Sequence, residues 1–353
     1  MKKSSRSSRP SDISDNMHSH SQFSSDDLNI CCESEIEKIS TQLQKTIVGN
    51  FRKRGFVLGL SGGIDSSVVA AICVKAVGKK RVLGLLMPER ESSPNTLVLS
   101  NLIADFLGIQ TIHIDITSIL EAVGCYKVRD NAIRELIPEY GAEYRCKIIL
   151  PSVLENEAYR LYSIVVESPD GKQKTKRLSK QGYLDILSAS NFKQRVRKML
   201  EYCHADRLNY AVAGTPNRLE YDQGFFVKSG DGAADTKPIA HLYKTQVYQL
   251  AEYLGVPKEI RERAPTTDTY SMPQSQEEFF FSLPYEKMDL CLYGKNHRIP
   301  IDQVAAATDL TTDQVERVYR DIDSKRESTQ YLHSAAILVE EVPELLIRPL
   351  EKG

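Results

Sequence analysis

The segment 56–77 constrains the fold more strongly than any other part of the chain. The apolar run 56–60 predicts a short buried strand, residues 61–63 (Ser-Gly-Gly) predict a tight turn, and the alanine-rich stretch 66–77 predicts a helix. A strand that passes through glycines into a helix N-terminus forms an anion cradle, because the backbone can approach the anion closely and the first-turn N–H groups and helix dipole favour negative charge. The segment therefore predicts a phosphate-binding turn.

Two other interpretations of this turn bear on its use. No Gly-Lys-Ser or Gly-Lys-Thr follows the glycines, so the turn is not a Walker loop. An ordinary strand-to-helix turn capped by Ser or Asp would show a similar local pattern, since both features are common at such turns. Evidence from other parts of the sequence is needed to distinguish a phosphate site from a plain turn.

Strand and helix patterns alternate along most of the chain. Residues 81–87, 110–114 and 209–213 predict further buried strands, and residues 36–51, 95–107, 192–204 and 242–254 carry helical apolar spacing. This alternation predicts an α/β fold, a doubly wound parallel sheet flanked by helices, with ligands at the carboxyl ends of its strands.

The predicted domain organisation is simple. Residues 1–27, rich in Ser and Asp, predict a disordered tail, and 28–353 a single domain. Within that domain, 125–190 is an irregular insertion that holds a β-hairpin (159–167 and 172–178) with a basic, solvated edge strand. The part 284–330 is expected to contain C-terminal helices at 284–293 and 311–327.

Composition excludes several classes of protein. The net charge of −1, from 46 basic and 47 acidic residues, disfavours nucleic acid as the main partner. No apolar run reaches the roughly 20 residues of a membrane span, and no secretory signal is evident, so a cytoplasmic protein without a membrane partner is expected. The seven cysteines form no Cys-x-x-Cys pair, and Cys73 and Cys203 are predicted to be buried in helices.

A second group of polar residues follows the strand 209–213. Thr215 and Glu220 lie just beyond it, on the same rim as Asp65 if the sheet is parallel. The carboxylates of Asp65 and Glu220 would repel each other at one phosphate site unless a cation lay between them, and hard oxygen ligands beside phosphate suit Mg²⁺. The alternative is that Asp65 caps its helix and Glu220 lies on the surface.

Three later segments could also present groups to a polar ligand. The Gly-Asp-Gly turn after Phe226 can present Lys228 and Asp235 toward such a ligand, and Lys244 opens a helix, where a lysine could meet phosphate. A loop rich in hydroxyl groups contains Thr266. A plain surface turn, a solvated lysine and a hydroxyl turn are the alternatives for these segments.

Six motifs together resemble the NAD⁺ synthetase family, a member of the ATP-pyrophosphatase group. They occur in that family's order between about residues 34 and 330: SGGIDSS, NFKQRVR, GTPNRLE, FFVKSGDGAAD, LYKTQ and PTTDT. The resemblance implies an adenine-nucleotide-hydrolase-like α/β fold and a homodimer. It also implies a ligase that uses ATP, Mg²⁺ and ammonia to convert deamido-NAD to NAD⁺ through an acyl-adenylate, releasing AMP and pyrophosphate.

The resemblance also implies roles for individual residues. Asp65, Lys244 and Asp268 would be catalytic, Asp65 and Glu220 would hold Mg²⁺, and the substrate dinucleotide would be bound by Arg195, Lys228 and Asp235. The residues implied to bind ATP are Gly59, Leu60, Ser61, Gly62, Gly63, Ile64, Asp65, Ser66, Thr215, Lys244 and Thr266.

The chain departs from the family pattern in ways that bear on the substrate. Residues 329–333 stand where the family usually has Glu-His-Lys-Arg, residues 276–282 contain a triple phenylalanine in place of an acidic loop, and the hairpin is inserted. The same chemistry on a different carboxylic acid is therefore the alternative function, and an RNA-modifying enzyme or a non-catalytic nucleotide-binding regulator are alternatives from other classes. Only about 55 residues precede the phosphate loop, so free ammonia, or ammonia from a separate partner, is expected rather than an attached amidase domain.

Overall fold

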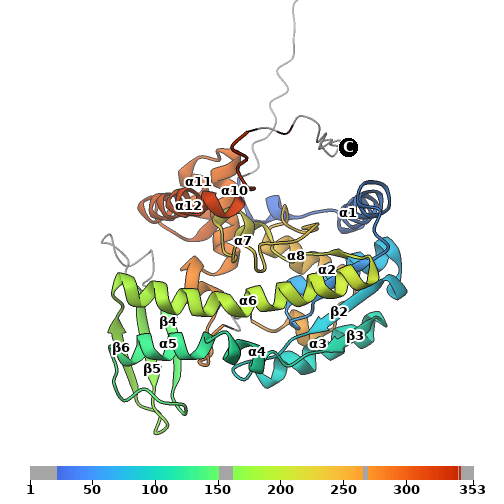
Figure 1. The fold of residues 1–353 in the computed structure, drawn as a ribbon. Helices are drawn as coiled ribbons and strands as arrows, with labels where there is room; N and C mark the ends of the chain where they lie inside the picture. The colour runs from blue at the N-terminus through green and yellow to red at the C-terminus, as the bar shows by residue number, and fades with distance from the viewer. Residues whose placement is uncertain (1–21, 151–161, 265–268, 341, 343–353) are drawn as a thin grey trace, which may run out of the picture.

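Four parallel strands form the central sheet of the computed structural model, which describes residues 22–150, 162–264, 269–340 and 342 (Figure 1). Their order is β3-β2-β1-β7. The strands are β1 (Phe56–Gly59), β2 (Val82–Leu86), β3 (Gln110–His113) and β7 (Ala211–Val212). All four were predicted from the sequence, and the doubly wound parallel sheet is confirmed.

The strand β1 shows how helices cover both faces of this sheet. Phe56 and Leu58 face a core shared with α1 (Cys32–Lys45), α2 (Ile64–Val77) and α8 (Lys244–Tyr253). Val57, between them in sequence, faces the opposite core with α6 (Lys180–Leu208). Side chains of a strand alternate between faces, so apolar residues at all three positions require helices on both sides.

The strand order places the site. Although β1 and β7 are separated by about 150 residues of sequence, they are neighbours, with Val57 opposite Val212. On its other side β1 pairs with β2, so the chain order reverses at the β1–β7 boundary. Ligands of open α/β sheets bind at the carboxyl ends of strands flanking such a switch point. Here these ends carry residues 60–66 and 213–220.

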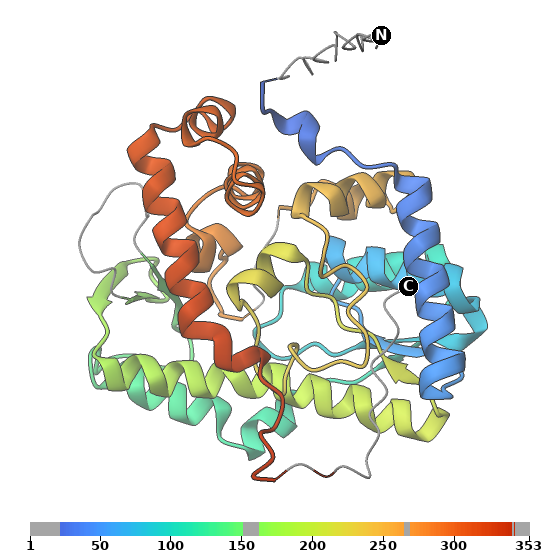
Figure 2. The ribbon, with the colours of Figure 1, turned by 90° about the horizontal axis from the view of Figure 1, so that it is seen from above.

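The remaining helices lie partly between the strands of the central sheet in sequence and partly in the C-terminal part of the chain. The C-terminal helices pack on one another around a separate core, and Figure 2 shows α12 on the side of the molecule opposite α1. The helices are α3 (Pro94–Leu107), α4 (Thr117–Ala122), α5 (Cys125–Arg134), α7 (Arg218–Gln223), α9 (Lys258–Arg261), α10 (Tyr285–His297), α11 (Ile301–Thr308) and α12 (Thr312–His333).

The insertion forms a second sheet that the sequence revealed only in part. The predicted hairpin is confirmed as β5 (Ser163–Glu167) and β6 (Gln173–Arg177), the latter an exposed edge strand, while residues 159–161 lie outside the described residues. The unpredicted strand β4 (Arg145–Ile149) pairs antiparallel with β5. The long helix α6 runs alongside both sheets (Figure 1), whereas the sequence predicted only residues 192–204, in its C-terminal half.

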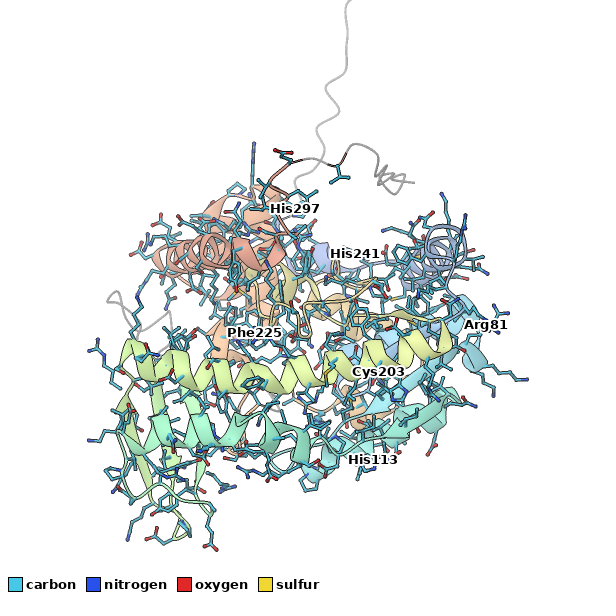
Figure 3. The ribbon with its side chains drawn as sticks, in the orientation of Figure 1. Arg81, His113, Cys203, Phe225, His241 and His297 are labelled. Carbon is cyan, nitrogen blue, oxygen red and sulfur yellow. The ribbon has the colours of Figure 1, made fainter. Side chains whose placement is uncertain are left out.

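Two further expectations are corrected. Residues 22–27 belong to the folded part: Phe23 is buried and stacks on Tyr293, and Ser25–Leu28 form a 3₁₀ helix with a capping box at Ser24. Cys73 is buried as predicted, but Cys203 is exposed on α6 (Figure 3) because its position falls on the outer face of that helix. None of the helices in the described ranges combines the length and apolar character needed to span a membrane.

Candidate active site

Two adjoining cavities open at the carboxyl ends of β1 and β7. Ser61, Ser66, Thr96 and Thr215 line both of them. The first, here called the apolar-walled cavity, extends from β1 toward β2, α3 and α6. The second, here called the charged cavity, holds Asp65 and Glu220, which the sequence placed at one rim, together with Lys244. The prediction that these segments converge is thus confirmed.

The glycine turn has the geometry of an anion cradle. Gly62 has φ +67°, and a Cβ at that position would lie 2.7 Å from the Leu99 Cβ, so only glycine fits without distortion. Gly63 N donates to Ser61 Oγ at 3.3 Å, and the Ser66 and Ser67 hydroxyls donate to the Gly63 carbonyl at 3.0 and 2.8 Å. These bonds hold the turn at the N-terminus of α2, where unpaired N–H groups and the helix dipole favour a phosphate.

Asp65 and Lys244 form an ion pair at the centre of the charged cavity. Lys244 is the first residue of α8 and is only 2% exposed. Burial acts to lower the pKa of Lys244, but the carboxylates of Asp65 and Glu220 outweigh it, so the pKa is raised and the lysine is a cation. A buried cation beside phosphate-binding N–H groups is suited to stabilise negative charge that develops on a phosphoryl group.

Glu220 completes the charged cavity. Burial, reinforced by the negative charge of Asp65, raises the pKa of Glu220 to about 8. Its Oε1 accepts a hydrogen bond from Gln276 Nε2 at 3.1 Å and its Oε2 accepts one from Asn217 N at 3.1 Å. The alternative in which Glu220 is a plain surface residue is therefore wrong, as is the alternative in which Asp65 caps α2, because Gly63 occupies the N-cap position.

Asn217 links these acidic groups and was not singled out from the sequence. Its side chain caps α7 by accepting from Glu220 N at 3.2 Å, and its Nδ2 donates to Asp65 Oδ1 at 3.0 Å. The pattern Asn-x-x-Glu at 217–220 is a capping-box signature, so the sequence did contain the signal for the first of these contacts.

The donor set of the charged cavity fits Mg²⁺ bound together with phosphate. Asp65 and Glu220 supply hard carboxylate oxygens. Burial and then repulsion by Asp65 raise the pKa of Glu220, and a divalent cation would favour its charged form. Within the described ranges no group of three or more His, Cys, Asp or Glu side chains forms a cage of protein ligands. This is the pattern that Mg²⁺ commonly uses, with one or two carboxylates and substrate phosphate oxygens.

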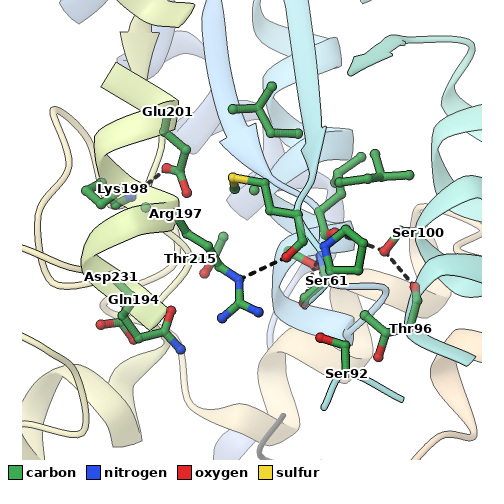
Figure 4. Close-up of a pocket in the computed structure, with 18 of the residues that line it drawn as sticks. Ser61, Ser92, Thr96, Ser100, Gln194, Arg197, Lys198, Glu201, Thr215 and Asp231 are labelled. Carbon is green, nitrogen blue, oxygen red and sulfur yellow. Dashed lines mark hydrogen bonds and ion pairs between the residues drawn. The ribbon is translucent and has the colours of Figure 1, made fainter. Parts of the chain in front are cut away.

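The apolar-walled cavity has two unlike sides (Figure 4). Leu85, Leu86, Met87 and Leu97 form an apolar wall at the end of β2 and the start of α3. The opposite side is polar and comes mainly from a single stripe on α6, with Asp231 beside it: Gln194, Arg197, Lys198 and Glu201. Sequence reasoning selected Arg195 on this helix and missed the stripe, whose i, i+3, i+4, i+7 spacing was the available signal.

The other residues predicted to bind ATP or to act in catalysis are divided between the two cavities and the part of the chain outside the described residues. Gly59, Leu60, Ser61 and Ser66 line the apolar-walled cavity, and Gly63 and Ile64 line the charged one. Thr266 and Asp268 lie outside the described residues.

Arg195, Lys228 and Asp235 line neither cavity. Arg195 Nε donates to the Lys228 carbonyl at 3.4 Å, and Lys228 Nζ donates to the Tyr331 carbonyl at 2.7 Å. The Asp235 carboxylate accepts from Val212 N at 2.8 Å and thus ties its loop to β7. In this structure the three side chains are engaged in contacts within the fold.

The comparisons with known proteins agree with this geometry. The NAD synthase family model matches residues 35–150 and 152–331. Proteins named NH(3)-dependent NAD(+) synthetase from Mesorhizobium japonicum and Rhizobium meliloti are 57% and 54% identical to this chain over 317 and 323 residues. The alignments cover 90% and 92% of this chain and 99% and 96% of those proteins.

Two solved structures support the fold alone, given their low sequence identity. The structure of NMN synthetase from Francisella tularensis aligns with a TM-score of 0.61 at 22% identity, covering 89% of this chain and 100% of its own. The NH3-dependent NAD synthetase from Campylobacter jejuni aligns with a TM-score of 0.57 at 23% identity, covering 88% and 100%. The ranges that the family model matches contain the residues lining both cavities, and this chain belongs to the NAD synthase family.

Proposed function

We propose that this protein is an ammonia-dependent NAD⁺ synthetase, a ligase that converts deamido-NAD, ATP and ammonia to NAD⁺, AMP and pyrophosphate. The observation that carries the proposal is the charged cavity, where Asp65, Glu220 and Lys244 meet beside the glycine turn at the β1–β7 boundary. Relatives more than 50% identical over almost their whole length carry names that give ammonia as the nitrogen source and NAD⁺ as the product. No observation favours a different carboxylic acid over deamido-NAD.

The first step turns a poor electrophile into a good one. An oxygen of the substrate's nicotinate carboxylate attacks the α-phosphorus of ATP, the bond to the bridging oxygen breaks, and pyrophosphate leaves. The residues implied to hold ATP are Gly59, Leu60, Ser61, Gly62, Gly63, Ile64, Asp65, Ser66, Thr215, Lys244 and Thr266. Negative charge grows on the α-phosphoryl oxygens and on pyrophosphate, where Lys244 and the N–H groups of the glycine turn stabilise it.

Mg²⁺, held by Asp65 and Glu220, would neutralise charge on the phosphates of bound ATP. Lys244 then keeps Asp65 oriented toward the phosphates through their ion pair, and Asn217 does the same through its hydrogen bond to Asp65. Glu220 has to be ionised to bind the cation, so binding releases its proton at pH values below about 8.

The second step forms the amide. The lone pair of ammonia attacks the acyl carbon of the adenylate, the C–O bond to phosphate breaks, AMP leaves, and the nitrogen loses a proton. Asp268 is assigned to positioning ammonium or accepting that proton. No side-chain nucleophile is required, because the acyl-adenylate is built from the substrates themselves.

The substrate dinucleotide is assigned to Arg195, Lys228 and Asp235, and the active protein to a homodimer in the cytoplasm. Arg195 lies on the outer face of α6, where Leu184 and Met199 are 43% and 56% exposed. The support for both assignments, the dinucleotide site and the homodimer, is membership of the NAD synthase family. Ammonia is taken to come from solution, in keeping with the names of the relatives.

The product assay tests the proposal directly. Purified protein is incubated with ATP, Mg²⁺, ammonium and deamido-NAD, and NAD⁺ and AMP are quantified by chromatography. The expected result is equal amounts of both products, with each component required and glutamine a poor replacement for ammonium. Binding of ATP without formation of NAD⁺ would refute the proposal.

A further inference from the structure

The ion pair of Lys198 and Glu201 lies in the apolar-walled cavity, and the roles assigned so far do not use it. Lys198 Nζ and Glu201 Oε2 are 2.6 Å apart, and both residues are buried, with exposed fractions of 5% and 6%. They are three residues apart on α6, they line the same cavity as Arg197, and a dashed line joins them in Figure 4. Removing two charges from water is costly, so a buried pair on a cavity wall needs a reason other than stability.

Glu201 keeps one oxygen available to a ligand. Its Oε2 is engaged by Lys198, whereas no described residue donates a hydrogen bond to Oε1. A carboxylate can accept further hydrogen bonds at its second oxygen. Burial raises the pKa of Glu201, and the ammonium of Lys198 opposes that effect. A ligand that donates a hydrogen bond would complete the coordination of this group.

The position of that oxygen is set by Gly59. A Cβ on Gly59 would lie 3.0 Å from Glu201 Oε1 and 3.4 Å from the Met87 Cε, so the absence of a side chain lets the carboxylate approach the end of β1. Gly59 precedes Ser61 of the phosphate turn by two residues, about 7 Å along an extended strand. The Glu201 carboxylate therefore lies about as far from the phosphate turn as a ribose extends from the α-phosphate of ATP.

We propose that Glu201, held by Lys198, accepts a hydrogen bond from a ribose hydroxyl of bound ATP and so discriminates ribonucleotides from deoxyribonucleotides. The inference rests on the proposed use of ATP at this site and adds a specificity-determining residue to it. The ribose adjoins the α-phosphate, whereas the base lies farther away, which places the base against the apolar wall of Leu85, Met87 and Leu97.

Binding measurements test the proposal without turnover. Titration calorimetry with ATP, 2′-deoxy-ATP, 3′-deoxy-ATP and purine riboside triphosphate is done in the absence of deamido-NAD and ammonium. Wild type should bind one of the two deoxy analogues at least roughly tenfold more weakly than ATP, because a hydrogen bond to a charged group is lost. Purine riboside triphosphate, which lacks the 6-amino group of ATP, should lose less affinity relative to ATP than that deoxy analogue does.

The variant K198M/E201L removes the pair without leaving a lone buried charge. Replacement of a buried ion pair by apolar residues of similar size is often neutral or stabilising, so the double variant should fold, which its melting temperature checks. It should bind ATP and the deoxy analogue with equal affinity. The matched control K295M/D323L removes the 2.8 Å ion pair between α10 and α12, away from both cavities, and should discriminate as wild type does.

Three results would overturn the proposal. One is a K198M/E201L variant that still discriminates against both deoxy analogues as wild type does. Another is a wild-type penalty that falls on the base analogue instead of the sugar analogues. The third is loss of discrimination in D231N with retention in K198M/E201L, which would give the role to the other carboxylate of this cavity. Failure of the NAD⁺ assay with ATP discrimination intact would refute the proposed function and leave this inference standing.

Discussion

The side-chain amide of Asn217 donates a hydrogen bond to Asp65 Oδ1 at 3.0 Å and joins the two loops that build the charged cavity. The same side chain caps α7, and the Asn217 backbone N–H donates to Glu220 Oε2 at 3.1 Å. One uncharged residue thus sets the separation of two acidic groups that repel each other. Its role in the site differs from its role as a helix cap, and the two can be separated by experiment.

Asn217→Ala should impair catalysis more than a lost cap explains. The expected loss of stability is about 1–2 kcal/mol, measured by chemical denaturation, since a cap and a partly buried hydrogen bond disappear. The rate of AMP formation at saturating ATP should fall at least about tenfold, an estimate based on one lost contact to a charged group. Thr311→Ala is the matched control because Thr311 caps α12 in the same capping-box arrangement, away from the site. Equal activity of the two variants would show that Asn217 is only a cap.

Lys244→Met should abolish adenylation and destabilise the protein in the absence of Mg²⁺. It leaves Asp65 and Glu220 facing each other without a cation, and breaking a buried pair in this way typically costs about 3–5 kcal/mol. Mg²⁺ should restore more stability to Lys244→Met than it adds to wild type, measured as melting temperature with and without the ion. If Mg²⁺ does not change the melting temperature of Lys244→Met, the result would contradict a cation site shared by Asp65 and Glu220.

Asp289 should make stability depend on pH through the helix that carries Lys244. It is fully buried and accepts hydrogen bonds from Lys244 N at 3.2 Å and Thr245 N at 2.7 Å. Burial raises the pKa of Asp289 from 3.8 to about 7, against the effect of those bonds and of the Lys244 charge. Because the folded state holds this proton more tightly, the contribution to stability is fully present below pH 3.8 and is lost as pH rises through about 7.

Denaturation of wild type and Asp289→Asn across that pH range measures the effect. The stability of wild type relative to the variant should decline as pH rises from about 4 to about 7, because the amide does not titrate. A difference between the two proteins that stays constant over this range would mean that Asp289 is charged throughout.

Gly62→Ala should disrupt the phosphate turn by steric overlap as well as by backbone strain. Its Cβ would lie 2.7 Å from the Leu99 Cβ and 3.0 Å from Ser100 N, at φ +67°. Gly171→Ala is the matched control, because Gly171 has φ +80° with nothing within 4 Å of the added carbon. Backbone strain of about 1 kcal/mol is expected in both variants. Only Gly62→Ala should lose additional stability and ATP affinity.

The sequence predicted the central sheet well because its strands are short apolar runs between helices. Buried parallel strands give that signal directly, and the glycine turn marks where β1 ends. The two halves of the charged cavity were also predictable, since Thr215 and Glu220 follow a strand just as Ser61 and Asp65 do. A parallel sheet brings such ends to one edge.

The remainder depends on packing that a single sequence does not encode locally. The strand β4 alternates charged and apolar residues over only five positions, a weak signal by itself, and it pairs with β5 in the folded chain. The polar stripe of Lys198 and Glu201 looks like an exposed helix face until β1, with Gly59 at its end, is placed against it. Phe23 is buried in a core formed with the C-terminal helices and stacks on Tyr293, which is far away in sequence.

The most direct test of the central claim follows the oxygen atoms of the substrate. Deamido-NAD labelled with ¹⁸O in the nicotinate carboxylate is converted in unlabelled water with ATP, Mg²⁺ and ammonium, and the products are analysed by mass spectrometry. If the carboxylate attacks the α-phosphorus, one ¹⁸O atom appears in the phosphate of AMP and none in pyrophosphate. Label in pyrophosphate or in orthophosphate, or NAD⁺ formed without label in AMP, would contradict an acyl-adenylate made in the charged cavity.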